Sequence, residues 1–251
     1  MKKFLISTCV AAAAASSTSA DNITMTLDSM PAYEAYSVAV NMRLTWNNSD
    51  PVSFTSTSVL AGEREWTNQY GREVTTYCIQ LFQGASIGET YTYSQTTDLN
   101  TVPGEETAPG PMSEVKVGMV EDLYARFMDL RTGKLADTAL TSDYDYATAS
   151  AAFQLVLWEI SHEDLTGTTL DEARDQLSMD MGAFRAAEAS SATQLIISAL
   201  GQDGWESTDN LVGLHSDTAQ DQLMVVPLPA PVVLAGIGLI GVAAVRRKRT
   251  R

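Results

Sequence analysis

Residues 151–160 read Ala151-Ala152-Phe153-Gln154-Leu155-Val156-Leu157-Trp158-Glu159-Ile160. The stretch is almost continuously apolar with one amide in its middle, and with its flanks it predicts a helix over about 147–162. Gln154 and Trp158 are four residues apart, so they lie one turn above another on the same helix face. A buried glutamine without hydrogen-bond partners is costly. We therefore expect the Gln154 amide either to bond backbone groups of a sheet or to take part in chemistry.

The first half of the chain has the two-residue period of β-strands. Between 36 and 46 the apolar side chains stand at even positions, which predicts a half-buried strand. A loop rich in proline and glycine follows at 102–112. We predict an α+β fold: an antiparallel β-sandwich or barrel-like domain with inserted or packed helices. Further strands are expected at 74–82, 89–93 and 221–226, and further helices around 120–130 and at 191–200, the last one closed by Gly201.

The N-terminus has the layout of a secretory signal peptide. Lys2 and Lys3 precede an apolar stretch at 4–15, and small residues follow up to Ala20. The apolar stretch is too short to cross a bilayer comfortably, which argues against a retained anchor. We expect signal peptidase to remove residues 1–20 and to leave an extracellular domain over 21–225.

The C-terminal segment, 226–251, combines a short proline motif, an uncharged apolar stretch at 231–245 and a basic end. As a helix the apolar stretch would rise by roughly 24 Å, a little less than a hydrocarbon core of ~30 Å. We predict a transmembrane helix with its basic end in the cytoplasm. The sorting motif is Val226, Pro227, Leu228, Pro229 and Ala230, and the basic stop is Arg246, Arg247, Lys248 and Arg249.

This three-part order resembles the PEP-CTERM class of bacterial sorting signals, in its VPLPA variant. The resemblance implies recognition by an exosortase-type membrane protease that cleaves near the proline motif. It also implies an exported protein of a Gram-negative bacterium, which is held transiently at the inner membrane by its C-terminal helix and then reaches the cell surface or the extracellular matrix.

Removal of both ends would make the protein strongly acidic. The two ends carry no acidic residue and hold seven of the 16 basic ones. The body then has nine basic residues against 31 acidic residues, a formal charge of −22. A charge of this sign argues against nucleic acid as a partner and for a soluble, self-repelling protein.

Cys78 is the single cysteine of the body, because Cys9 lies within the signal peptide. An intramolecular disulfide is then impossible, and the thiol is reactive, linked to another molecule, or buried and inert. On a strand, Tyr77 and Ile79 would share one face and Cys78 would point to the other.

The combination of Cys78 and Gln154 resembles the thioester domains of bacterial surface adhesins. Those domains carry an aromatic residue and cysteine in an early strand and, far downstream, a glutamine followed by apolar residues and tryptophan. The matching residues here are Tyr77, Cys78 and Ile79 in the first motif, and Gln154, Leu157 and Trp158 in the second.

Family-like sequence also surrounds the first motif, with Ala61-Gly62 before it and 88–93 after it. Two positions depart from the pattern: Gln80 stands where an acid is usual, and Phe153 precedes the glutamine where adhesins often have threonine. The first departure bears on how the thiol is activated, and the second indicates a distant branch of the family.

The resemblance implies an internal thioester. The Cys78 thiolate would attack the Gln154 side-chain carbonyl and expel ammonia, provided that the two groups are held in near-attack geometry. Phe153, Leu157 and Trp158 would exclude water, and an amine or hydroxyl on a surface or matrix target would later open the thioester. This is single-use covalent chemistry rather than enzymatic turnover, and it requires no cofactor or metal.

Three other interpretations remain open at this point. A cysteine hydrolase would pair Cys78 with His162 or His215. A non-reactive envelope or matrix protein would keep the same fold with Cys78 unbonded. Asp143 and Asp145 could bind calcium, although an acidic helix start explains them better.

Overall fold

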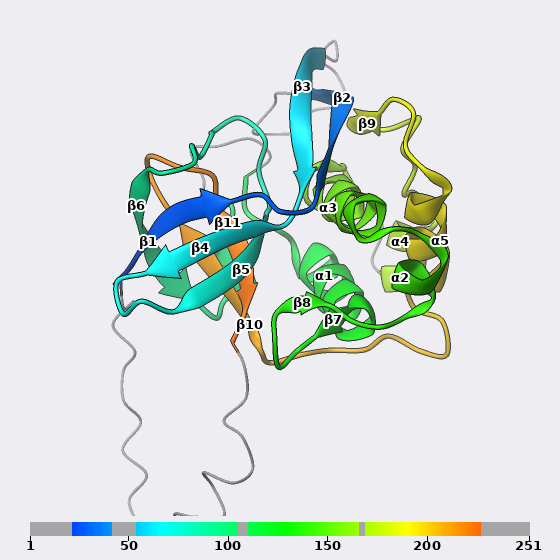
Figure 1. The fold of residues 1–251 in the computed structure, drawn as a ribbon. Coiled ribbons are helices and arrows are strands. Elements are labelled where there is room, and N and C mark those ends of the chain that lie inside the picture. The colour runs from blue at the N-terminus through cyan, green and yellow to red at the C-terminus, as the bar shows by residue number, and fades with distance from the viewer. Residues whose placement is uncertain (1–21, 42–53, 105–109, 166–168, 227–251) are drawn as a thin grey trace, which may run out of the picture.

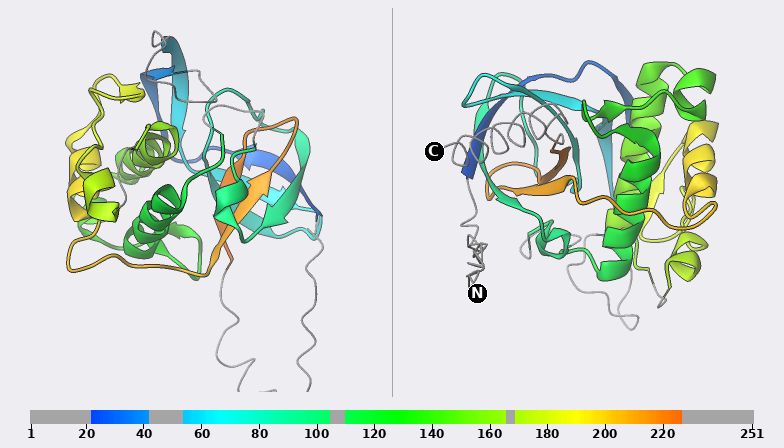
Figure 2. Two further views of the ribbon diagram at one scale, coloured as in Figure 1. Left: turned by 180° about the vertical axis from the view of Figure 1, so that it is seen from behind. Right: turned by 90° about the horizontal axis from the view of Figure 1, so that it is seen from below.

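The computed structural model describes residues 22–41, 54–104, 110–165 and 169–226. Within these ranges a β-barrel and a helical part lie side by side (Figure 1). Figure 2 shows the same arrangement from behind and from below. The predicted signal peptide at 1–20 and nearly all of the predicted sorting segment lie outside the described residues.

Six antiparallel strands close into the barrel in the order β1-β4-β5-β11-β10-β6. In β1 the alternation decides which side chains face inward, since Ile23, Met25 and Leu27 are buried and the threonines between them are partly exposed. Trp66 and Tyr93 pack edge to face in the barrel core, with ring centroids 5.8 Å apart. The strands are β1 (Asn22–Ser29), β4 (Arg64–Asn68), β5 (Glu73–Cys78), β6 (Thr90–Thr96), β10 (Leu211–His215) and β11 (Gln222–Val225).

The helical part is built around α3 (Tyr146–His162), which is buried at every residue from Ala149 onward. Helices α1 and α5 and strands β2 and β3 pack against α3, which explains why its sequence is apolar all round. Three strands of this part form an antiparallel sheet in the order β3-β2-β9, and β7 and β8 form a separate two-stranded sheet. The other elements are α1 (Glu114–Phe127), α2 (Ala139–Asp143), α4 (Leu170–Arg174), α5 (Ser191–Ala199), η1 (Leu99–Thr101), β2 (Tyr33–Asn41), β3 (Phe54–Gly62), β7 (Met128–Asp129), β8 (Lys134–Leu135) and β9 (Phe184–Ala186).

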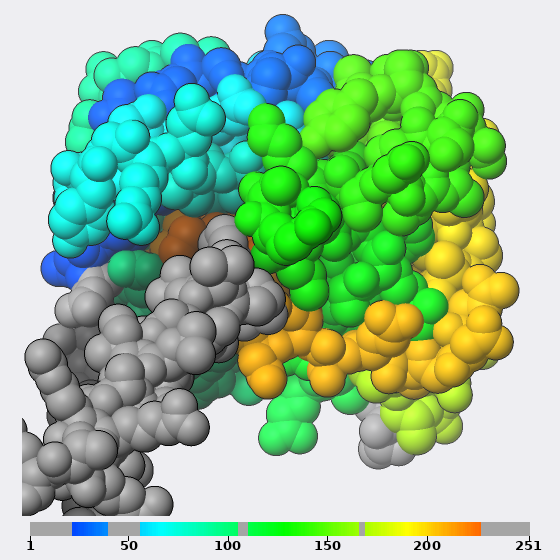
Figure 3. All heavy atoms as spheres, turned by 60° about the horizontal axis from the view of Figure 1, so that its bottom comes forward, coloured from blue at the N-terminus to red at the C-terminus, as the bar shows by residue number. Residues whose placement is uncertain are grey.

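The chain crosses between the two parts near both of its ends. It leaves the barrel after β1, forms β2 and β3 in the separate sheet, and returns to the barrel in β4. After α5 it runs along the edge of the helical part and re-enters the barrel in β10 (Figure 3, orange). The barrel and the helical part therefore fold from interleaved segments rather than from two consecutive halves.

The predicted fold class is wrong. The structure has a closed six-stranded antiparallel barrel with helices beside it, instead of a sandwich or barrel-like domain with a C-terminal transmembrane helix. No helix among the described residues is long and apolar enough to cross a membrane, and the stretch 231–245 predicted to do so lies outside them. The alternation at 36–46 indicated a half-buried strand but not its partners, and that strand, β2, belongs to the separate sheet.

Several individual elements were predicted correctly. The helices expected at 147–162 and 191–200 are α3 and α5, and Gly201 follows α5 with a φ of +68°. Asp145, considered above for calcium, is the N-cap of α3 and accepts a hydrogen bond from the Thr148 backbone N–H at 3.0 Å. The strand expected at 74–82 is shorter, because β5 ends at Cys78.

Gly62 lies where the chain turns from the separate sheet back into the barrel. Its φ of +148° and its close approach to Ala32 leave no room for a side chain, since a Cβ atom would lie 2.1 Å from the Ala32 carbonyl oxygen. We expect Gly62→Ala to lower the free energy of unfolding by at least about 1 kcal/mol. Urea denaturation measures this loss, with Gly84→Ala as the control because open space surrounds Gly84. Equal denaturation midpoints for the two variants would contradict the prediction.

Candidate functional site

Cys78 ends β5 at the boundary between the barrel and α3, and Gln154 reaches it from the middle of α3. The two residues are 76 positions apart in the sequence. Both side chains are completely buried. The predicted pair is therefore brought together by the packing of the central helix against the end of a barrel strand.

Three contacts join Gln154 to Cys78. The Cys78 backbone N–H donates to Gln154 Oε1 at 3.1 Å, and Gln154 Nε2 donates to the Cys78 carbonyl oxygen at 2.7 Å. The Cys78 thiol lies 3.6 Å from Gln154 Oε1. The first two bonds satisfy the buried amide through the backbone of β5, as one of the two expectations for Gln154 required. The third places the sulfur against the carboxamide group that a thioester would use.

Arg64 is the second side chain that contacts the sulfur. It is buried at the start of β4, and its Nη1 donates to Cys78 Sγ at 3.0 Å. Its Nη2 donates to Gln220 Oε1 at 3.0 Å. Burial raises the pKa of the Cys78 thiol, while the positive charge of Arg64 and its hydrogen bond act in the opposite direction.

The sequence interpretation did not identify Arg64 or Gln220. Strand β4, which carries Arg64, was not predicted, and it pairs with β5 so that Arg64 lies opposite Thr76, two residues before Cys78. The spacing of Arg64 and Trp66 was an available signal, since a period of two would place both side chains on one face of a strand. Nothing in the local sequence marks Gln220 as a neighbour.

The four side chains predicted to surround the pair are all buried. Tyr77 packs against Phe153 with ring centroids 4.6 Å apart, on the face of β5 turned to α3. The Trp158 indole N–H lies near the Cys78 thiol and lowers its pKa as a weak donor, although it meets no acceptor at full hydrogen-bond geometry within the described part of the chain. Leu157 belongs to the same apolar core. All four side chains thus belong to the buried surroundings of the pair.

Neither histidine contacts Cys78 among the described interactions. The His162 Nδ1 atom lies 2.9 Å from Ser161 Oγ and 3.1 Å from the Trp158 carbonyl oxygen, and burial lowers the His162 pKa to about 3. His215 lies beside Asp221, whose charge and hydrogen bond raise the pKa of the imidazole against the effect of burial. The geometry therefore gives a cysteine hydrolase no histidine base.

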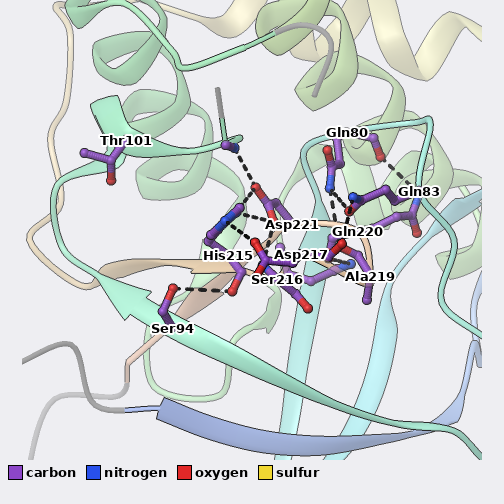
Figure 4. A network of polar contacts seen from close by, with 12 residues as sticks. Gln80, Gln83, Ser94, Thr101, His215, Ser216, Asp217, Ala219, Gln220 and Asp221 are labelled. Carbon is purple, nitrogen blue, oxygen red and sulfur yellow. Dashed lines mark hydrogen bonds and ion pairs between the residues drawn. The ribbon is translucent and has the colours of Figure 1, made fainter. Parts of the chain in front are cut away.

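The β10–β11 connection forms a polar network at this end of the barrel (Figure 4). Buried Asp221 accepts from the backbone N–H groups of Gly104 at 2.8 Å and Ser216 at 2.9 Å, and it also contacts His215. Gln80, where thioester domains usually have an acid, bonds Gln83 at 2.8 Å instead of the thiol. Among the described residues, the charged group in contact with the sulfur is the guanidinium of Arg64.

One of the predicted sorting residues, Val226, lies in the described part of the chain. Val226 is described, half exposed and bonded through its N–H to the Asn210 carbonyl oxygen at 2.7 Å. The other predicted sorting and basic-stop residues lie outside the described ranges.

No protein family, curated protein or solved structure matches this chain.

Proposed function

We propose that this protein forms an internal thioester between Cys78 and Gln154 and uses it for covalent attachment to a surface or matrix target. The observation that carries the proposal is the contact between the buried Cys78 thiol and the Gln154 side-chain carboxamide, whose oxygen lies 3.6 Å from the sulfur. This oxygen belongs to the carboxamide whose carbonyl carbon the sulfur would attack, so the two groups are already in contact, as an intramolecular reaction requires.

Thioester formation would be balanced within the pair. The Cys78 sulfur attacks the Gln154 side-chain carbonyl carbon, the C–N bond breaks, and the amide nitrogen leaves as ammonia with the thiol proton. The Cys78 backbone N–H already donates to Gln154 Oε1 at 3.1 Å, so it is positioned to stabilise the oxyanion of the tetrahedral intermediate. The Cys78 carbonyl oxygen, which holds Gln154 Nε2 at 2.7 Å, orients the nitrogen that leaves.

Attachment would follow when a nucleophile reaches the thioester. An amine on the target attacks the carbonyl carbon, an amide forms through Gln154, and Cys78 is released as a thiol. Because both residues are fully buried, the target or a movement of the surrounding side chains must open the site first. The buried state explains how an activated ester would survive in water until then.

We propose in addition that the protein is exported and sorted to the cell surface or matrix. The support is in the sequence: a signal peptide at 1–20 for signal peptidase, and the Val226–Ala230 motif for an exosortase-type protease. The excess of acidic residues in the body suits an extracellular domain that must stay soluble.

Intact mass of the mature protein tests the thioester. We expect a mass lower than that of the unmodified chain by one ammonia molecule, and we expect Cys78→Ala and Gln154→Ala each to abolish the loss. Gln80→Ala is the matched control, because Gln80 is also a fully buried glutamine but does not contact the sulfur among the described residues. This variant should keep the mass loss.

Treatment with methylamine gives a second reading on the same samples. The thioester should take up one methylamine at Gln154 and expose one thiol to maleimide. An unmodified mass, together with a Cys78 thiol that maleimide labels without methylamine, would rule out the thioester. The remaining interpretation would then be a non-reactive envelope or matrix protein, in which Gln154 only pairs with the backbone of β5.

A further inference from the structure

Arg64 is an unusual side chain to find in the interior of this protein. It is 5% exposed, and within the described ranges no carboxylate forms an ion pair with it. Its Nε atom has no hydrogen-bond partner there. The groups that its guanidinium does contact are the Cys78 sulfur and the Gln220 amide oxygen, each at 3.0 Å.

A buried guanidinium is retained at a cost unless it is paired or hydrogen-bonded. Here the group that can supply a negative charge at contact distance is the Cys78 sulfur, once its proton is lost. Arg64 therefore favours the thiolate over the thiol, and the thiolate is the form that attacks a carbonyl. The same charge favours the thiolate as a leaving group when a nucleophile later attacks the thioester.

We propose that Arg64 is the activating residue of the thioester: it stabilises the Cys78 thiolate both when the thioester forms and when it is opened. This inference rests on the proposed function and names the group that drives it.

Gln220 holds Arg64 in place from the β10–β11 connection. Its Oε1 accepts from Arg64 Nη2, and its Nε2 donates to the Gln80 carbonyl oxygen at 3.0 Å. Figure 4 shows Gln220 beside Gln80, while the adjacent Asp221 turns to His215. Gln220 is a positioning residue in this scheme, since it acts on the sulfur only through Arg64.

The ionisation of Cys78 depends on few other groups. Among the described residues, the titratable side chains other than Arg64 whose charges interact with Cys78 are Tyr93 on β6 and Tyr124 on α1. Burial raises the pKa of both tyrosines and so favours their neutral forms. The rate of thioester formation should thus rise with pH as the thiolate fraction rises, and Arg64 should set where that rise occurs.

The thiol pKa can be measured without any thioester in a Gln154→Ala background. The thiolate is followed by its ultraviolet absorbance, with Cys78→Ala/Gln154→Ala as the blank. Adding Arg64→Met or Arg64→Gln should raise the pKa by about one to three units, the usual effect of losing an adjacent opposite charge. Adding Arg64→Lys should raise it less. A thiol pKa that is the same with and without the guanidinium in folded variants would overturn the proposal.

The rate of ammonia loss is measured in the full chain with Gln154 intact. The unfolded protein is diluted from denaturant at a series of pH values, and intact mass is followed with time. Arg64→Gln should slow the reaction roughly tenfold or more at neutral pH and shift its pH profile upward, because each pKa unit changes the thiolate fraction tenfold. Gln220→Ala keeps the charge and should give a smaller loss of rate.

The outcomes separate the two proposals. A wild-type chain that never loses ammonia refutes the proposed function, whatever the Arg64 variants do. A wild-type chain that loses ammonia, with a folded Arg64→Gln variant that loses it at the same rate and with the same pH profile, refutes only the role of Arg64. Circular dichroism of each variant establishes that it is folded before its rate is compared.

Discussion

Trp158→Ala is expected to lower the free energy of unfolding by about 3–5 kcal/mol, the usual cost of truncating a buried aromatic side chain. Trp158 is almost completely buried in the core shared by β5 and α3. Its removal also opens a cavity next to the Cys78 sulfur. We therefore expect water to reach the thioester and hydrolyse it, which leaves a glutamate at position 154 and a free Cys78 thiol.

Two measurements check the Trp158 prediction. Urea denaturation gives the loss of stability, and intact mass after storage gives the fraction hydrolysed. Trp66→Ala is the matched control, because Trp66 is equally buried but belongs to the separate core inside the barrel. The control should lose similar stability and keep its thioester. Equal hydrolysis in the two variants would show that Trp158 does not shield the bond.

Glu159→Gln is expected to stabilise the protein at neutral pH by roughly 3 kcal/mol. Glu159 is completely buried, and burial is the main reason why its pKa is raised from 4.5 to about 9. The folded protein thus binds a proton at pH 7 that the unfolded chain has released. The contribution of Glu159 to stability is fully present below pH 4.5 and is lost as pH rises towards about 9. A pH of 7 lies about 2.5 units above the ordinary pKa of 4.5, and each unit corresponds to about 1.4 kcal/mol, so roughly 3 kcal/mol of stability is lost at pH 7.

The glutamine side chain should fit the same place. Glu159 Oε1 accepts from the Ser178 backbone N–H at 2.7 Å, and an amide oxygen can accept this bond equally well. The other oxygen of Glu159 has no partner among the described residues, so the amide nitrogen loses no bond by replacing it. The variant should therefore remove the pH dependence without removing a contact.

Urea denaturation from pH 5 to pH 9 measures the effect of Glu159→Gln. The difference in free energy of unfolding between the variant and the wild type should grow steadily with pH. Glu73→Gln is the control, because Glu73 is exposed at the start of β5. A difference that stays constant over this pH range would contradict the raised pKa of Glu159.

Local sequence was sufficient to single out the two residues that we propose to react at the candidate site. Cys78 follows from counting cysteines, and Gln154 from the one amide in an otherwise apolar helix. Both signals are local, because each depends on a few neighbouring residues. The local nature of these signals also explains why the fold prediction was wrong. A period of two in the sequence predicts a half-buried strand but does not tell which strands pair with it.

The residues that sequence reasoning missed depend on long-range pairing. Arg64 reaches the sulfur because β4 and β5 are neighbours in the barrel, and Gln220 reaches Arg64 from a connection 156 residues further along the chain. The barrel closes only when β1, β4, β5, β11, β10 and β6 meet in that order. Nothing within any one of these short strands specifies such an order.

The sequence by itself singled out Cys78 and Gln154, predicted the helices α3 and α5, and showed that the body of the protein is acidic. Only the tertiary structure decided that Cys78 and Gln154 meet in the buried interior beside a buried arginine. The physical reason is that hydrophobic periodicity predicts which side chains are buried, whereas the neighbours of a buried side chain depend on how the whole chain packs.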